Sequence, residues 1–118
     1  KSVPWADICR LTMLVPEQDS ATRQFIAGLM KIHGGDTPQL LDFGNIEAIK
    51  QGVMRGMGVS ILPLATVRRE LSGGELARCR IVDISLERTV DCVCRKNVPL
   101  TWWERKFLDL FSSQPSPY

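Results

Sequence analysis

The stretch GVMRGMGVSILP, from Gly52 to Pro63, holds three glycines and two methionines before a short apolar run that ends at proline. Ala48, Gly52 and Gly56 recur every four residues, which predicts a stripe of small side chains on a helix that lies close to a neighbouring backbone. Gly56 suits a left-handed helix cap, and the run up to Pro63 predicts a strand in the interior of a sheet. Because these glycines follow a helix and precede a strand, their order is the reverse of a dinucleotide-binding loop.

The sequence around this stretch alternates between two kinds of hydrophobic pattern. Short apolar runs predict strands at 11–16, 38–43 and 58–63. Amphipathic patterns predict helices at 17–35, with Asp19 or Ser20 as N-cap, at 44–57, with Asn45 as N-cap, and at 64–74. This alternation is typical of βαβ units, so we predict an α/β fold with a mostly parallel sheet and flanking helices, as in half of a two-lobed binding protein.

The C-terminal part of the sequence does not continue this alternation of strand and helix patterns. Two extended segments are predicted at 75–84 and 88–96, and a last helix at 100–111. Thr101 and Glu104 have the spacing of a capping box at its start. A stripe of apolar side chains on this helix predicts packing: Trp103, Phe107, Leu110 and Phe111. Residues 113–118 have the composition of a disordered tail.

Length and composition exclude several classes of protein. The chain has 118 residues, 44% hydrophobic and 24% charged, which fits one globular domain or a piece of one. A net charge of +2 is too small to indicate a nucleic-acid or membrane surface. No apolar run approaches the ~20 residues of a membrane span, and the N-terminus lacks the apolar core of a signal peptide. We therefore expect a cytoplasmic protein without contact to a membrane.

Catalytic and metal-binding motifs are missing from the sequence. The four cysteines form no CxxC pair, and the single histidine, His33, lies far from each of them in sequence. Cys92 and Cys94 are two residues apart on a predicted strand, a spacing at or beyond the reach of a disulfide, so buried thiols are expected. Nucleophile and phosphate-binding motifs are also absent, so we predict no enzyme, no metal and no cofactor.

Several segments together resemble the LysR-type transcriptional regulators. The helix–strand stretch IEAIKQGVMRGMGVSILP, the following LATVRRELSGGEL, the upstream ADICRLTMLVPEQDSATRQFI and the ending DCVCRKNVPLTWWERKFLDLF are all similar to that family's effector-binding domain. The resemblance implies a lobe of the periplasmic-binding-protein type II fold. It also implies that residues 1–90 form the second lobe, and that residues 91–112 are a strand and helix returning to the first. The family's winged helix-turn-helix and the first half of its first lobe have no counterpart here.

The expected site lies at the carboxyl ends of the predicted strands, where parallel α/β sheets bind ligands. The family resemblance places these turns in a cleft between two lobes. The candidate contacts are Gln18, Ser20, Thr22, Gly44, Asn45, Ile46 and Pro63. Ser20 and Asn45 have an alternative role as helix caps, which is compatible with ligand contact. Glu17 and Asp19 would repel an anion at the first turn.

The resemblance implies an effector-sensing domain of a transcriptional regulator. Its expected ligand is a small organic acid or amino-acid derivative, and its expected assembly is a homodimer or homotetramer. DNA contact is expected only through the absent N-terminal domain. The alternative is one lobe of a transporter's solute-binding protein, which shares the two-lobed fold. Because the last helix lacks first-lobe partners, we also expect it to mediate self-association or to be mobile.

Overall fold

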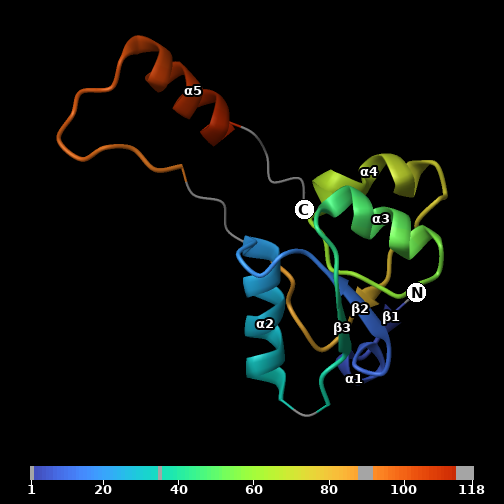
Figure 1. Cartoon of the computed structure of the whole chain (residues 1–118). Coiled ribbons are helices and arrows are strands. Elements are labelled where there is room, and N and C mark those ends of the chain that lie inside the picture. Colours follow the sequence, from blue (N-terminus) through green and yellow to red (C-terminus); the bar gives the residue numbers. More distant parts are fainter. Residues whose placement is uncertain (1, 35, 88–91, 114–118) are drawn as a thin grey trace. The chain divides into compact units, whose positions relative to one another are not determined.

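The computed structural model describes residues 2–34, 36–87 and 92–113 of a chain that divides into two compact units, Lys1–Ser85 and Leu86–Tyr118. The first unit contains, in chain order, β1 (Ser2–Val3), α1 (Trp5–Ile8), β2 (Thr12–Val15), α2 (Ala21–His33), β3 (Gln39–Asp42), α3 (Ile46–Met54), α4 (Leu64–Ser72) and β4 (Arg80–Ile81) (Figure 1). The second unit contains α5 (Trp102–Ser113). Each unit is described separately below.

The parallel strand pair β2–β3 forms the centre of the first unit. Its register pairs Thr12 with Gln39 and Val15 with Asp42. The side chains of Met13, Leu14 and Val15 are completely buried, so β2 is covered on both faces. This confirms the prediction of a buried strand, and its continuous apolar sequence is the reason.

Different helices cover the two faces of β2. Because successive side chains of a strand point to opposite faces, Met13 and Val15 share one face, and they join a core cluster with Ile26 of α2. Leu14 points the other way and touches Gly52 of α3. Figure 1 shows α2 on one side of the strand pair and α3 on the other. The structure thus confirms both predicted helices.

A second parallel pair, β1 with β4, joins the two ends of the first unit. Val3 pairs with Ile81, and the main-chain N–H of Trp5 donates to the Asp83 carboxylate at 2.9 and 3.2 Å. The Trp5 side chain is buried in the same core cluster as Ile81. The sequence patterns predict neither β1 nor α1, because elements of two and four residues are too short to show periodicity.

The helical half of the 52–63 stretch agrees with the sequence prediction. Gly56 follows α3 with φ of 74°, the left-handed conformation of a helix cap. Gly52 is buried, and a Cβ there would lie 3.1 Å from the Phe43 ring as well as clashing with Leu14. Of the predicted stripe of small residues, Gly52 therefore makes the close contact, whereas a Cβ on Gly56 would meet no described atom within 4 Å.

The prediction of a strand at 58–63 is correct for one residue pair and wrong for the rest of the segment. Val59 makes a single parallel bridge to Met13, and the residues from 58 to 63 are half-buried instead of filling the interior. The Ser60 hydroxyl donates to the Leu14 carbonyl at 2.8 Å. In a continued parallel ladder this carbonyl would accept the N–H of Ile61, so the Ser60 side chain takes the place of the next rung.

The predicted mostly parallel sheet is therefore two separate parallel pairs, β1–β4 and β2–β3, among the described residues. The architecture is mixed α/β with parallel strands, as predicted. Its sheet is less continuous than the sequence indicates. Each strand pairs with one other strand, and β2 has in addition the single bridge to Val59 and the hydrogen bond from the Ser60 hydroxyl.

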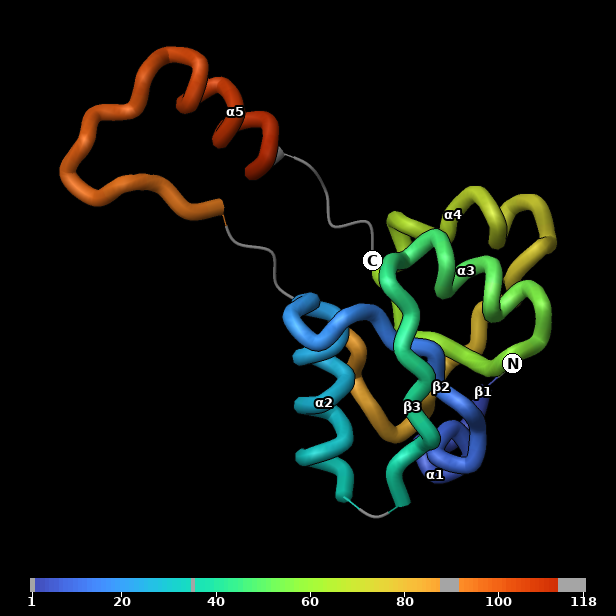
Figure 2. Tube along the Cα trace, viewed as in Figure 1, coloured from blue at the N-terminus to red at the C-terminus, as the bar shows by residue number. Residues whose placement is uncertain are grey.

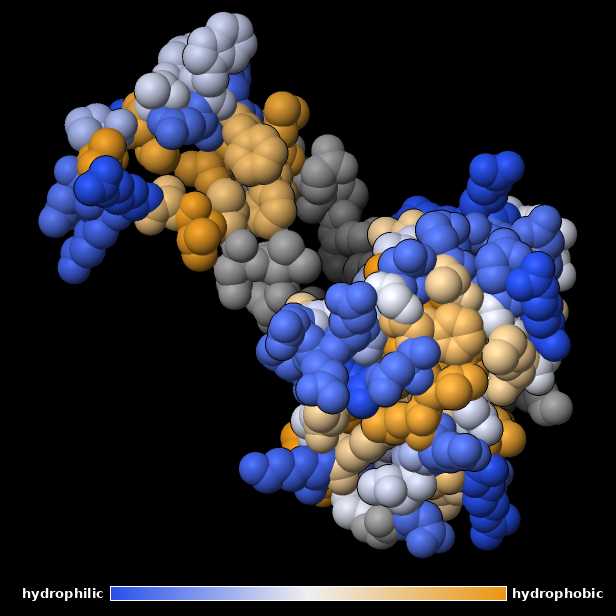
Figure 3. Space-filling model, in the orientation of Figure 1, coloured by the Kyte–Doolittle hydropathy of each residue, from blue (hydrophilic) through white to orange (hydrophobic). Residues whose placement is uncertain are grey.

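The second unit consists of an extended segment followed by α5. Glu104 accepts the Thr101 N–H at 2.6 Å and the Thr101 hydroxyl accepts the Glu104 N–H at 3.3 Å, which confirms the predicted capping box. This hydrogen bonding, chiefly from the Thr101 N–H, lowers the pKa of the Glu104 carboxyl. Figure 3 shows hydrophobic side chains at the surface of this unit. The predicted apolar stripe is exposed: Trp103 by 76%, Phe107 by 59%, Leu110 by 64% and Phe111 by 42%.

The extended segments and the tail agree only partly with expectation. Of the segment predicted at 75–84, only Arg80–Ile81 forms a strand. Residues 92–96 form no strand, and 88–91 lie outside the described residues. The expected tail at 113–118 also lies outside them, apart from Ser113 at the end of α5. The assignment of 1–90 and 91–112 to two different lobes stays a prediction.

Candidate functional site

Two turns of the first unit lie next to each other at the carboxyl end of the β2–β3 pair. The parallel register pairs Val15 with Asp42, the last residue of each strand, and Phe43 donates its N–H to the Val15 carbonyl at 2.9 Å. The chain then enters α2 through residues 16–20 and α3 through residues 43–45. Figure 2 shows both turns at the same end of the strands. This is the edge at which parallel α/β sheets bind ligands.

Each turn ends in a side-chain helix cap. The Ser20 Oγ accepts the Arg23 N–H at 3.0 Å, and the Asn45 Oδ1 accepts the Ala48 N–H at 2.9 Å. Both predicted caps are therefore confirmed. A cap of this kind satisfies one N–H of the first helical turn and leaves others available. The adjacent starts of α2 and α3 thus present main-chain donors at one edge of the strand pair.

An ion pair that the sequence patterns do not reveal joins the two turns. The Arg23 guanidinium in α2 binds the Asp42 carboxylate at the end of β3. The same guanidinium donates to the Pro16 carbonyl at 3.4 Å. The Arg23 side chain is largely buried, so this contact holds α2 against the ends of both strands. No local signal could have found it, because its two charges come from different elements.

The structure brings six of the seven candidate residues to these two turns. One group lies in the β2–α2 turn or the first turn of α2, and the other in the β3–α3 turn or at the start of α3: Gln18, Ser20 and Thr22, and Gly44, Asn45 and Ile46. The seventh, Pro63, is the N-cap residue of α4. Because the bridge between Met13 and Val59 is parallel, the chain runs from Val59 toward the same end of β2. Contact of these residues with a ligand stays a prediction.

A network centred on Lys50 supports α3 behind the site. Its ammonium group lies 2.7 Å from a carboxylate oxygen of Glu47 in α3 and 2.7 Å from one of Glu70 in α4. Lys50 is buried, whereas Glu47 is exposed and Glu70 is nearly enclosed. Hydrogen bonds to Glu47 and then Glu70 raise the pKa of Lys50, and the bond from Lys50 lowers the pKa of Glu70.

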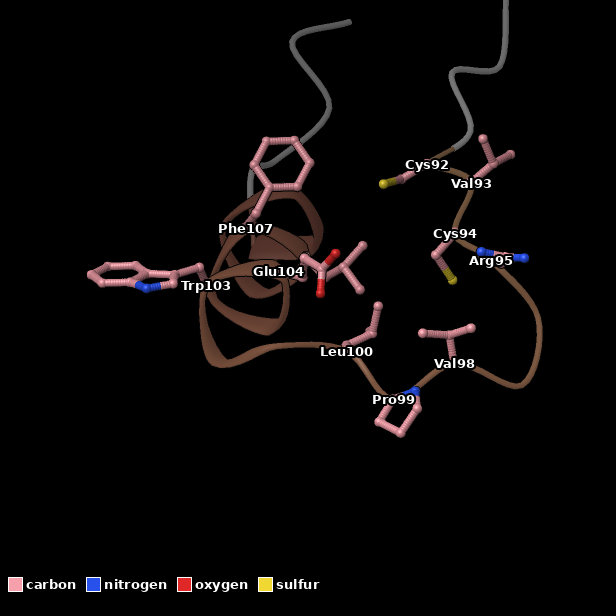
Figure 4. A pocket seen from close by; sticks show the side chains of 11 residues that line it. Cys92, Val93, Cys94, Arg95, Val98, Pro99, Leu100, Trp103, Glu104 and Phe107 are labelled. Atoms are coloured by element: carbon pink, nitrogen blue, oxygen red, sulfur yellow. The ribbon is translucent and has the colours of Figure 1, made fainter.

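Two hollows occur elsewhere in the described residues, and neither is lined by any of the seven candidate residues. One, of about 260 Å³, belongs to the first unit and is lined by Trp5, Cys9, His33 and Asp83 among others. The other, of about 550 Å³, lies within the second unit between α5 and the extended segment. Figure 4 shows Phe107, Leu100 and Cys92 facing this hollow.

The cysteines are less buried than predicted. Cys9 is buried, and burial raises the pKa of its thiol. The prediction of buried thiols is wrong for Cys92 and Cys94, which are exposed, as is Cys79. Cys92 and Cys94 lie on the extended segment of the second unit, where Val93 and Val98 are also exposed. Within the described ranges, no group of three or more potential metal ligands comes together, and no helix is long and apolar enough to cross a membrane.

Comparison with known proteins identifies one family model and several relatives that agree on the kind of protein. A family model described as LysR substrate binding domain matches residues 1–115. The HTH-type transcriptional regulator CbbR of Rhodospirillum rubrum is 32% identical over 96 residues, covering 81% of this chain and 32% of CbbR. The RuBisCO operon transcriptional regulator of Acidithiobacillus ferrooxidans is 35% identical over 75 residues, covering 64% of this chain and 24% of that protein.

A third relative is also named as a transcriptional regulator. The HTH-type transcriptional regulator CfxR of Cupriavidus necator is 35% identical over 77 residues, covering 65% of this chain and 24% of CfxR. The chain therefore spans a third or less of the length of these three curated relatives. All three are named as transcriptional regulators, which favours a domain of a transcriptional regulator over a lobe of a transporter's solute-binding protein.

Proposed function

Because this chain belongs to the LysR substrate-binding domain family, we propose that it senses a small effector on behalf of a transcriptional regulator. In this proposal the first unit supplies one wall of a ligand cleft, at the β2–α2 and β3–α3 turns. Residues 91–112 belong to the first lobe, and that lobe supplies the opposite wall. The rest of the regulator binds DNA, and the regulator acts in the cytoplasm as a homodimer or homotetramer.

The observation that carries this proposal is the pairing of Val15 with Asp42. It sets two capped helix starts next to each other at one edge of the strand pair, with six candidate residues around them. Main-chain N–H groups at such helix starts are fixed donors, since the strands and helices hold them in place. A ligand that fills this edge meets several donors without requiring any rearrangement of the first unit.

The effector acts by shifting a population of domain arrangements. A ligand that contacts both walls of a cleft binds one relative orientation of the walls more tightly, and it can shift the equilibrium only by that difference in affinity. The first unit is suited to move as one body, because its two ends are joined through the β1–β4 pair and the Trp5–Asp83 hydrogen bonds. The orientation then determines how the DNA-binding parts are presented.

The test uses the full-length protein, expressed from the complete reading frame that contains this chain. A metabolite library is screened by thermal shift, and each hit is tested for its effect on binding to DNA from the protein's own promoter region. We expect at least one metabolite to raise the melting temperature and to change DNA affinity. Binding of a metabolite without any change in DNA affinity would contradict the regulatory role.

Substitution of one candidate residue tests whether the ligand binds in the proposed cleft. Thr22→Val removes a hydroxyl at the first turn of α2, and we expect it to weaken ligand binding by about fivefold, the equivalent of one hydrogen bond. Thr37→Val makes the same chemical change at an exposed position outside both turns and serves as the matched control. Equal affinity of the two variants would place the ligand elsewhere.

A further inference from the structure

Arg23 connects the two turns of the candidate site. Resting on the proposed function, we propose that Arg23 is a positioning residue of the effector site: its guanidinium holds the β2–α2 turn beside the β3–α3 turn, and the effector binds to the arrangement that results. Arg23 thereby acts on effector affinity through Asp42, without a contact of its own to the effector. Loss of this ion pair should weaken effector binding more than it destabilises the fold.

Arg23 has contacts at both ends of one turn and at the end of the neighbouring strand. Its main-chain N–H donates to the Ser20 Oγ at 3.0 Å, so it belongs to the cap that starts α2. Its guanidinium donates to the Pro16 carbonyl at 3.4 Å, directly after β2, and binds the Asp42 carboxylate at the end of β3. One residue therefore closes the β2–α2 turn and ties it to the strand that leads into the β3–α3 turn.

No second polar contact of this kind supports the start of α2. Among the described residues, no other polar side chain of α2 forms an ion pair or a hydrogen bond with β2 or β3. The buried side chains of α2, those of Thr22, Ile26 and Leu29, pack the helix against its neighbours without directional bonds. A guanidinium shared between a carbonyl and a carboxylate fixes direction as well as distance. The orientation of the first turn of α2 relative to β3 therefore depends on Arg23.

The exposure of the pair explains why effector affinity should respond more than stability. The Arg23 side chain is 16% exposed and that of Asp42 is 66% exposed, so water hydrates the carboxylate readily when the pair is broken. Ion pairs with an exposed partner contribute little to the free energy of unfolding. A ligand that needs both turns in one arrangement binds more weakly in proportion to the fraction of molecules that have that arrangement. A pair of small stabilising effect is therefore enough to change effector affinity several-fold.

The experiment uses the full-length protein and, as its probe, the metabolite with the largest thermal shift in the library screen. Isothermal titration calorimetry measures the Kd of this metabolite for wild type, Arg23→Met, Asp42→Ala and the double variant. We expect each single variant to raise the Kd about fivefold and the double variant to raise it no further, because the two side chains act as one unit. The melting temperature without metabolite should fall by less than about 4 °C in each variant.

Lys31→Met is the matched control, since it removes a cation from an exposed position in the last turn of the same helix. It should leave the Kd unchanged, and an increase equal to that of Arg23→Met would reduce the effect to net charge and overturn the inference. Arg23→Lys keeps the charge but loses the planar fork that serves two acceptors, so it should retain only part of the affinity.

A direct contact between Arg23 and the effector gives a different pattern. Asp42→Ala would then leave the affinity unchanged or raise it, because it frees the guanidinium for the ligand, while Arg23→Met would still lower it. This pattern would overturn the inference and leave an effector-sensing role intact.

Hydrogen exchange of the ligand-free protein separates the inference from the proposed function. In Asp42→Ala, peptides that cover residues 16–24 and 43–48 should exchange faster than in Lys31→Met, whereas peptides from α4 should be unchanged. Unchanged exchange in both turns would overturn the inference, whether or not a metabolite binds. Absence of any binding metabolite, together with faster exchange in both turns, would overturn the proposed function and support Arg23 as the residue that positions the turns.

Discussion

In the first unit the apolar side chains of strands and helices meet one another, whereas in the second unit those of α5 meet mostly solvent. Met13, Leu14, Ile26 and Ile49 are completely buried, but Trp103, Phe107 and Leu110 are more than half exposed. Both units have well-formed helices with caps. The difference shows that a correct amphipathic pattern and a correct cap make a helix, and that only a facing element makes a core.

The largest effect expected from this difference concerns matched core substitutions. Ile49→Ala should lower the free energy of unfolding of the first unit by about 3 kcal/mol, because it removes a fully buried side chain. Phe107→Ala should leave that free energy unchanged, because Phe107 is 59% exposed in the second unit. Urea unfolding followed by the fluorescence of Trp5, the buried tryptophan, measures both when Trp102→Phe and Trp103→Phe are present in every variant.

A gentler variant keeps this comparison usable if Ile49→Ala does not fold. Ile49→Val should cost about 1 kcal/mol at the same position. A loss from Phe107→Ala as large as that from Ile49→Val would show that the second unit contributes to the first unit's stability, and the distinction between the units would fail.

A second, smaller effect separates two carboxylates that share one ammonium. Glu70 and Glu47 lie at the same 2.7 Å from Lys50, but the Glu70 side chain is 13% exposed and the Glu47 side chain 76%. Glu70→Gln should lower the melting temperature of the first unit by about 5–10 °C, because it leaves a buried charge with a weaker partner. Glu47→Gln should change it by less than about 2 °C. Thermal unfolding followed by circular dichroism shows whether burial or distance controls how much each carboxylate stabilises the first unit.

The same pair predicts a pH dependence with a definite sign. The pKa of Glu70 is lowered from its ordinary 4.5 by the Lys50 hydrogen bond, so its stabilising contribution is present above that value. It is lost as the pH falls through the lower pKa of the folded state. The wild-type melting temperature should therefore fall in acid more steeply than that of Glu70→Gln, and parallel curves would contradict the assignment.

The smallest effect belongs to the capping box of the second unit. Because the pKa of Glu104 is lowered, the cap contributes at pH values above the ordinary 4.5 and is lost on acidification below it. The protection of the first amide protons of α5, taken relative to the intrinsic exchange rate at the same pH, should fall in acid, and Thr101→Ala should lower it at every pH. Hydrogen exchange read at residues 102–105 measures this, and unchanged protection in Thr101→Ala would contradict it.

Local signals account for the parts of the fold that the sequence predicts. Ser20, Asn45 and Thr101 cap helices as expected, because a cap depends on residues three positions away. The buried character of β2 is also visible in its uninterrupted apolar run. The two turns of the candidate site follow directly from these boundaries and from the parallel pairing of the strands.

Long-range partners account for what the sequence does not predict. The Arg23–Asp42 and Lys50–Glu70 pairs join residues of different elements, and nothing in the local pattern selects these partners among the other charges. Pairing with β2 stops after the bridge at Val59, because the Ser60 hydroxyl takes the Leu14 carbonyl. A hydrophobic pattern counts Ser60 only as polar and does not predict this hydrogen bond. The exposure of Cys92 and Cys94 depends on which element faces them, which no local pattern states.

The close passage of Gly58 past β2 also fixes the alignment between two segments. A Cβ on Gly58 would clash with the carbonyl oxygen of Thr12, so only glycine is tolerated at that point. A slip of the chain by one residue in either direction would bring Met57 or Val59 against that oxygen. Gly58 thereby fixes the position of the following segment along β2, and with it the position of Pro63, the N-cap residue of α4.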